Sequence, residues 1–162
     1  MEYINAPWRA KYVRHVIQTD ACIFCQALEN PESRDAHILH RGRHNFVIQN
    51  KFPYTPGHLL VAPLKHLDSP EKASLESAHE LWDMTVLCLK ILREVYSPKG
   101  FNTGMNLGQC AGAGVTGHYH THIVPRWPGD SNFMPIVGNT KVVIETLDST
   151  YEQLRPLFQK QE

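Results

Sequence analysis

Three histidines alternate with other residues in the segment His118-Tyr119-His120-Thr121-His122. Side chains of a strand alternate between its two faces, so a strand here would point all three imidazoles the same way, with neighbours roughly 6.5–7 Å apart. Imidazole acts as a nucleophile, as an acid or base near neutral pH, or as a metal ligand. The alternation therefore favours a chemical site over a surface strand whose histidines are only hydrogen-bonded.

Two chemistries stay open for this row from the residues alone. In the first, an imidazole nitrogen attacks a phosphoryl group and forms a phosphoramidate, which water or another acceptor then cleaves. The glycine-rich loop from Gly108 to Gly117 would supply backbone N–H donors for the phosphoryl oxygens, and Asn106 a side-chain donor. In the second, two histidines at i and i+2 bind a catalytic zinc ion.

A second candidate site combines Cys22 and Cys25, which form a C-x-x-C motif, with His66 downstream. This spacing is the usual half-site of tetrahedral zinc centres, whose ligands are Cys and His. A lone C-x-x-C motif also fits a redox pair. The motif thus indicates a zinc site or a dithiol.

The elements that position these residues follow from hydrophobic periodicity. Short strands are predicted over 38–40 and 45–49, as a hairpin around Gly42, and over 58–62, 101–107 and the histidine segment. Apolar residues at 3–4 spacing predict a long amphipathic helix over 74–96, with Trp82 in the core. Shorter helices are expected over 8–16 and over 146–160, the latter interrupted at Pro156. This order favours an α+β fold with a largely antiparallel sheet.

Composition places the chain among ordinary globular proteins. Its 162 residues, 42% of them hydrophobic, suit one domain with a substantial core. Sixteen basic and sixteen acidic residues cancel, so no bulk charge favours nucleic acid or an anionic membrane. No apolar run approaches the ~20 residues of a membrane span, and the first residues do not resemble a signal peptide. We expect a cytoplasmic protein whose four cysteines are thiols or ligands and not disulfides.

The segment from Gly117 to Arg126 resembles the signature of the histidine-triad (HIT) superfamily. The upstream segment 50–61, with Pro56-Gly57-His58, and the later Asn106-Leu107-Gly108 and Ala111-Gly112 match further blocks of that family. The similarity covers most of residues 22–127. The segments 6–9 (Ala-Pro-Trp-Arg) and 125–135 are most similar to a branch of diadenosine tetraphosphate phosphorylases and their bacterial hydrolase-like relatives.

The resemblance implies a role for each matched histidine. His120 would be the nucleophile that takes the nucleotidyl group, and His122 would hold the α-phosphate oxygens. His118 would support the row, and His58 lies where the family's upstream histidine meets the triad.

The nucleotide-binding positions follow from the same resemblance. Asn50 matches the ribose-binding position, Ile48 would lie against the base, and Asn106 would contact the phosphate or the leaving group. Many relatives carry Ser or Thr just before the triad, and Thr116 is the candidate for that place, with its register left open.

The resemblance also implies a zinc site and an overall activity. Zinc-carrying members use a similar Cys pair, so the ligands of a structural zinc would be Cys22, Cys25, His66 and His118, and no organic cofactor is expected. We expect a single HIT domain over 1–162 (core about 22–127, N-terminal segment 1–21, C-terminal extension 128–162) that forms a homodimer.

The expected activity is cleavage of a nucleoside polyphosphate, first of all diadenosine tetraphosphate, at the α-phosphate through a nucleotidyl-histidine. The enzyme would be a phosphorylase (ATP adenylyltransferase-like) if phosphate resolves this intermediate, or a hydrolase if water does. The alternatives are a nucleoside phosphoramidate hydrolase and a non-catalytic nucleotide-binding interaction module.

Overall fold

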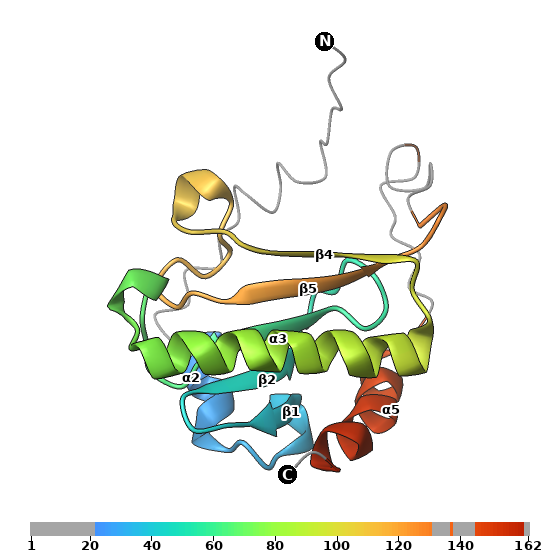
Figure 1. Cartoon of the computed structure of the whole chain (residues 1–162), viewed down its shortest axis with the longest axis horizontal. Coiled ribbons are helices and arrows are strands. Elements are labelled where there is room, and N and C mark those ends of the chain that lie inside the picture. The colour runs from blue at the N-terminus through green and yellow to red at the C-terminus, as the bar shows by residue number, and fades with distance from the viewer. Residues whose placement is uncertain (1–21, 131–136, 138–144, 161–162) are drawn as a thin grey trace.

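The computed structural model describes residues 22–130, 137 and 145–160. Within them, five strands form an antiparallel sheet in the order β1-β2-β3-β5-β4 (Figure 1). The strands are β1 (Ile38–Arg41), β2 (Asn45–Gln49), β3 (Leu59–Pro63), β4 (Gly100–Met105) and β5 (Thr121–Arg126). The helices are α2 (Ile23–Glu29), α3 (Leu75–Tyr96) and α5 (Leu147–Gln159), with short 3₁₀ turns η1 (Arg34–Ala36), η2 (Pro70–Lys72) and η3 (Gln109–Ala111).

The α+β class and the antiparallel sheet are confirmed, and each predicted strand between 38 and 107 is present within two residues of its expected ends. The helix expected over 8–16 and the segment 6–9 lie outside the described residues, as does 131–135. Within the part of the chain that is described, no helix has the length and hydropathy that a membrane span requires.

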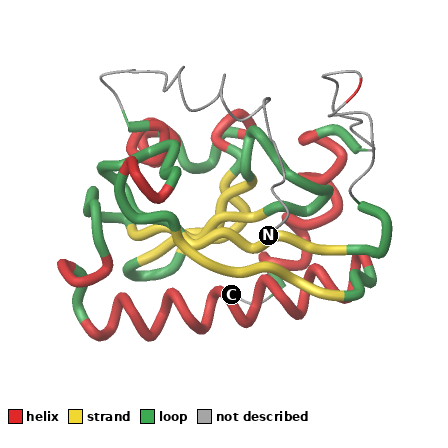
Figure 2. Tube along the Cα trace, turned by 90° about the horizontal axis from the view of Figure 1, so that it is seen from above, coloured by secondary structure: helices red, strands yellow, loops and turns green. Residues whose placement is uncertain are grey.

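The two faces of the sheet enter two separate hydrophobic clusters. On one face, α3 and α5 pack against Val47, Leu59 and Ile123, and Figure 2 shows α3 running along that side of the strands. On the other face, Phe24 of α2 packs against alternate residues of β2 and β3, which include Ile48. Because side chains alternate along a strand, β1, β2 and β3 each contribute to both clusters. The rings of His118 and His120 contact Phe24, so the histidine row lies on the α2 face.

Helix α3 begins and ends close to the predicted positions, but its buried stripe is narrower than expected. The Ser74 side chain caps its start by accepting from Ser77 N, and Ser97, in the left-handed region, ends it. Trp82 is 64% exposed, so its placement in the core was wrong. Hydrophobic periodicity identifies the face of a helix that is apolar, but it does not fix where the edge of that face meets solvent.

A carboxylate on α3 holds the predicted β1–β2 hairpin. Glu80 accepts hydrogen bonds from the backbone N–H groups of Arg43, His44 and Asn45 at 2.7–2.8 Å. A Cβ on Gly42 would lie 2.6 Å from Glu80 Oε1, so this close approach requires glycine. Burial raises the pKa of the Glu80 carboxyl, but the hydrogen bonds outweigh it and leave the pKa lowered.

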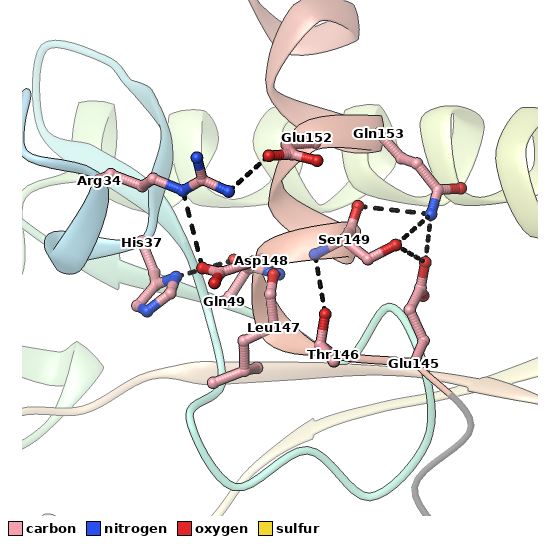
Figure 3. Close-up of polar contacts among 10 residues, drawn as sticks. All are labelled: Arg34, His37, Gln49, Glu145, Thr146, Leu147, Asp148, Ser149, Glu152 and Gln153. Atoms are coloured by element: carbon pink, nitrogen blue, oxygen red, sulfur yellow. Dashed lines mark hydrogen bonds and ion pairs between the residues drawn. The ribbon is translucent and has the colours of Figure 1, made fainter.

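Helix α5 runs through Pro156 without interruption, contrary to the prediction. Leu154 and Phe158 are fully buried on either side of the proline, and their packing against the sheet and α3 offsets the lost backbone bond. At the start of α5, the Gln49 amide donates to Leu147 O (3.1 Å), and His37 Nδ1 donates to the Gln49 oxygen (3.1 Å) (Figure 3). The helix is therefore tied to the end of β2.

Candidate active site

The three histidines of the row share one face, but only the last lies within a regular strand. Strand β5 begins at Thr121, so His118 and His120 occupy the extended segment before it. Both rings are nearly inaccessible to solvent, whereas His122 is half-buried. The rings of His120 and His122 lie 4.9 Å apart between centroids. The predicted grouping of the three imidazoles is therefore present.

The ring of His120 is held through one of its two nitrogens. Nδ1 lies 3.0 Å from the backbone oxygen of His118, and a carbonyl only accepts, so Nδ1 carries the proton. Burial lowers the pKa of His120, with the hydrogen bond to His118 opposing it. The ring is thus a neutral imidazole whose Nε2 keeps its lone pair. That is the form in which imidazole attacks an electrophile.

A chain of hydrogen bonds fixes the proton on His122 as well. The backbone N–H of Tyr54 donates to Nδ1 of His58 (3.0 Å), so the proton of His58 lies on Nε2. That nitrogen is 3.0 Å from Nδ1 of His122 and donates to it. Burial and the neighbouring His120 lower the pKa of His122 to about 4, so at neutral pH this ring is uncharged. Its remaining N–H, on Nε2, is left as a donor for a ligand.

The expected nucleotide-binding residues are spread around this row. Asn50 contacts both nitrogens of His58 (3.3 and 3.4 Å), and Ile48 is buried beside Phe24. Asn106 lines a cavity together with His122. Thr116 is exposed in the loop before the row, and none of the contacts of the described residues joins it to the histidines.

A second group of side chains converges beside the start of the row. The ligand atoms of Cys22, Cys25, His66 and His118 all lie within 4.8 Å of one another. Nδ1 of His118 is 3.3 Å from Cys22 Sγ, and Nδ1 of His66 is 3.3 Å from Cys25 Sγ. The resemblance therefore grouped the same four residues that the fold brings together.

The surroundings of this Cys/His cluster leave its ring nitrogens ready to bind a metal. Nε2 of His118 donates to the backbone oxygen of Pro63 (2.8 Å), so Nδ1 presents a lone pair to the sulfurs. Burial lowers the pKa of His118 to about 4, which keeps the ring neutral. A Cβ on Gly117 would lie 3.1 Å from Nε2 of His66, so glycine gives that ring its room.

The cluster has the composition and approximate spacing of a tetrahedral zinc site. Bond lengths of 2.0–2.3 Å imply ligand atoms about 3.3–3.8 Å apart, and the closest contacts here match. Burial and the adjacent Cys22 raise the pKa of the Cys25 thiol. Two thiolates this close repel each other unless a cation lies between them. The residues thus fit a closed structural zinc site, while a redox pair would not require the two histidines.

Two aromatic residues at the site were not predicted. Phe24, inside the C-x-x-C motif, contacts the rings of His118 and His120 at 5.0 and 4.9 Å between centroids. Tyr54 contacts His58 at 4.7 Å and lies nearly parallel to His122. Tyr54 lies within the matched upstream segment 50–61, which is a signal that could have identified it, whereas an apolar residue between two cysteines carries no such signal.

Comparisons with known proteins agree with this geometry. A Mycobacterium tuberculosis protein named AP-4-A phosphorylase is 39% identical over 125 residues, which are 76% of this chain and 64% of that protein. The chain thus spans less than two thirds of that relative's length. A Dictyostelium discoideum protein named bis(5′-adenosyl)-triphosphatase is 27% identical over 134 residues, 78% of this chain and 89% of that protein.

Solved structures show the same fold. The crystal structure of a Zn-bound histidine triad family protein from Mycobacterium smegmatis superposes with a TM-score of 0.69 at 22% identity, covering 88% of this chain and 96% of that one. Residues 31–129 match the sequence profile of the HIT domain, a range that includes all of the strands and the three histidines. The chain therefore belongs to the HIT domain family.

Proposed function

We propose that this chain is an enzyme that cleaves a nucleoside polyphosphate at the α-phosphate through a covalent nucleotidyl-His120 intermediate. The observation that carries the proposal is the state of the His120 ring. Its Nδ1–H is bonded to His118 O, so Nε2 of a neutral, buried imidazole is the available nucleophile. The donor of His122 lies beside it, where the oxygens of a phosphoryl group would be.

The reaction would proceed in two displacements at phosphorus. Nε2 of His120 attacks the α-phosphorus, the P–N bond forms, and the P–O bond to the leaving phosphate chain breaks with its electron pair on oxygen. His122 donates its N–H to a non-bridging oxygen while charge builds up. An acceptor oxygen then attacks the same phosphorus, and the electron pair of the P–N bond returns to Nε2 of His120. An unprotonated oxygen of inorganic phosphate needs to lose no proton, whereas water as the acceptor would release one to solvent.

Of the residues matched by resemblance, Asn50 and Ile48 would hold the nucleotide on the β2 side of this centre, and Asn106 lies after β4. Asn50 would bind the ribose, Ile48 would lie against the base, and Asn106 would contact a phosphate oxygen. Asn50 lies next to His58 and Ile48 next to Phe24, so both are near the histidine row, which supports these assignments. The role of Thr116 stays a prediction from the resemblance, because none of the contacts of the described residues joins it to the row.

The substrate we favour is a dinucleoside polyphosphate, first of all diadenosine tetraphosphate, with phosphate as the acceptor. The names of the two relatives support this class, and the relative at 39% identity is named as a phosphorylase.

The test is turnover of diadenosine tetraphosphate with and without inorganic phosphate, with AMP, ADP and ATP resolved. ATP and ADP formed only with phosphate would support the proposal in full, whereas ATP and AMP without phosphate would make the enzyme a hydrolase. If no product forms under either condition, the same assay with an adenosine phosphoramidate distinguishes a phosphoramidate hydrolase from a binding module and overturns the proposed substrate.

We also propose that Cys22, Cys25, His66 and His118 hold a structural zinc ion. A zinc ion there would join α2 to the segment that carries His118, and it would contribute to folding without activating water. The composition of the cluster and its short contacts support this assignment. A homodimer, expected from the resemblance and testable by light scattering, and the cytoplasmic location both stay predictions.

A further inference from the structure

A cavity of about 480 Å³ extends from His122 toward the edge strand β4. The register pairs His122 with Gly104 and Val124 with Asn102, so these residues of β4 and β5 form its floor. Tyr54 lines it on the side of the β2–β3 loop. The roles proposed above use only two of its lining residues, His122 and Asn106. The rest of this cavity, which we call the β4 cavity, has no assigned role.

The far end of the β4 cavity carries an oriented guanidinium group. Arg126 makes a bidentate ion pair with Asp130 (2.5 and 2.9 Å), and its Nη1 donates to Asn102 Oδ1 (2.5 Å). These bonds use three of the five N–H groups of the guanidinium and fix its plane. The amide nitrogen of Asn102 is also a donor at this wall. Such fixed donors suit the oxygens and ring nitrogens of a polar ligand.

The near wall of the cavity offers an aromatic surface. Tyr54 is 52% exposed although its ring packs on His58, and it lines the cavity. An exposed ring beside a donor-rich cavity is the arrangement on which a nucleobase stacks. A volume of about 480 Å³ lies within the range of small-molecule sites and is far more than one phosphate ion requires.

The strand order places this cavity opposite the expected site of the transferred nucleotide. Ile48 and Asn50 are on the β2 side of the row, and β4 is on the other side of β5. From His122 to Arg126 the strand spans ~13 Å. A substrate whose α-phosphate lies at His120 would therefore extend its two ends toward opposite edges of the sheet.

We propose that the β4 cavity binds the leaving nucleotide of a dinucleoside polyphosphate, with the second base on Tyr54 and polar groups of that nucleoside near Asn102 and Arg126. The inference rests on the proposed function and adds to it a subsite that selects substrates with two nucleosides over substrates with one.

The test compares two substrates that share the transferred nucleotide and the four phosphates. Diadenosine tetraphosphate carries the second nucleoside, and adenosine 5′-tetraphosphate lacks it. In Tyr54→Ala, we expect the ratio of kcat/KM for the first substrate to kcat/KM for the second to fall about tenfold, because one stacked base is lost. Loss of the ring beside His58 and His122 would lower kcat/KM for both substrates by the same factor and leave this ratio unchanged. Tyr54→Phe keeps the ring and should keep the selectivity. Phe52→Ala removes an exposed aromatic residue of the same loop that does not line the cavity, and it serves as the matched control.

Asn102→Ala gives a second, independent test of the subsite, because this exposed side chain contacts Arg126 and none of the histidines. It should lower kcat/KM for diadenosine tetraphosphate selectively, by about threefold to tenfold. Equal losses for both substrates, no loss for either, or a raised KM for inorganic phosphate alone would overturn the inference. If the wild type cleaves neither substrate, the proposed function itself fails. If it cleaves both and the Tyr54 and Asn102 variants do not discriminate between them, only the subsite fails.

Discussion

The histidine row and the Cys/His cluster use the same kind of side chain, and His118 belongs to both, yet they are suited to different chemistry. In the cluster, four ligand atoms lie within 4.8 Å of one another, which is the arrangement that a single ion stabilises. In the row, His122 lines a cavity large enough for a substrate, and no third or fourth ligand atom converges on the rings of His120 and His122 among the described residues.

Backbone groups decide which nitrogen of each ring is available. Pro63 O accepts from Nε2 of His118 and leaves Nδ1 for the sulfurs, whereas His118 O accepts from Nδ1 of His120 and leaves Nε2 for attack. The position of one backbone carbonyl oxygen therefore decides that the ring of His118 is suited to bind a metal and that the ring of His120, two residues later, is suited to act as a nucleophile. We therefore expect substitutions in the row to affect turnover and substitutions in the cluster to affect stability.

The largest effect is expected from His120→Ala. Loss of the nucleophile should lower kcat by on the order of 10⁴-fold or more, while nucleotide binding stays within a few fold, because the nitrogen acts in the chemical step. Steady-state kinetics and equilibrium binding measure the two quantities. His79→Ala, at an exposed position of α3, is the control and should change neither. Binding that is lost in proportion to kcat would contradict the role assigned to His120.

Removal of one cluster ligand should act on stability instead. Cys25→Ser should reduce bound zinc from about one ion per chain to well below that and cost about 4 kcal/mol, or roughly 10 °C in Tm. Turnover below the transition should fall less than about tenfold, because His120 is held by a backbone oxygen and not by the metal. Cys110→Ser, at an exposed cysteine outside the cluster, should match the wild type in metal analysis and in thermal unfolding.

If Cys25→Ser keeps its Tm but loses its turnover, the cluster is part of the catalytic machinery, and the division between a catalytic row and a structural cluster is wrong. A wild-type protein that holds well below one zinc per chain would remove the structural ion altogether.

The next effect tests the hydrogen-bond chain behind the row. His58→Ala removes the donor to His122 Nδ1, so the proton of His122 is no longer fixed on Nε2. We expect kcat to fall about 10–100-fold with KM changed much less, because a misdirected donor costs mainly in the transition state. Circular dichroism would verify that the variant is folded. A kcat within twofold of the wild type would show that Tyr54 and His58 do not position His122.

Sequence patterns predicted the row more completely than the cluster, for a physical reason. Strand alternation is local, so the spacing of His118, His120 and His122 was enough to place the rings together. The contacts of Cys22 with His118 and of Cys25 with His66 join positions 96 and 41 residues apart. Residue types suggested His66 as a partner of the cysteine pair, but only the family resemblance indicated His118. Long-range contacts depend on how the strands pair, which spacing along the chain does not encode.

The sequence did not allow any prediction of which nitrogen of each histidine ring is available to a ligand. The available nitrogen depends on backbone groups at Pro63, His118 and Tyr54, and a backbone N–H or C=O has no signature in residue type. Pro156 in α5 likewise illustrates that tertiary packing overrides a local preference. Fold class and candidate residues are therefore accessible from the sequence, whereas protonation and the β4 cavity required the coordinates.

The smallest effect separates the two regions by their response to acid. The pKa of His122 is about 4 in the folded chain and about 6.5 when unfolded, so between these values the unfolded state binds more protons. Stability should fall as the pH is lowered from about 6.5 toward 4. Loss of metal from the Cys/His cluster would add to this fall, because zinc binding requires deprotonated ligands.

His122→Gln isolates the contribution of the histidine row to this loss of stability, because the Cys/His cluster is the same in the wild type and in the variant. We expect the variant to lose about 1 kcal/mol less than the wild type over this pH range, a value that allows for solvent screening at a half-buried ring. Urea unfolding at pH 7, 5.5 and 4.5 measures the difference, with Cys25→Ser as the matched protein in which the contribution of the cluster is removed. Parallel losses in the wild type and His122→Gln would mean that His122 does not contribute to the loss of stability in acid, which would contradict the lowered pKa of this ring.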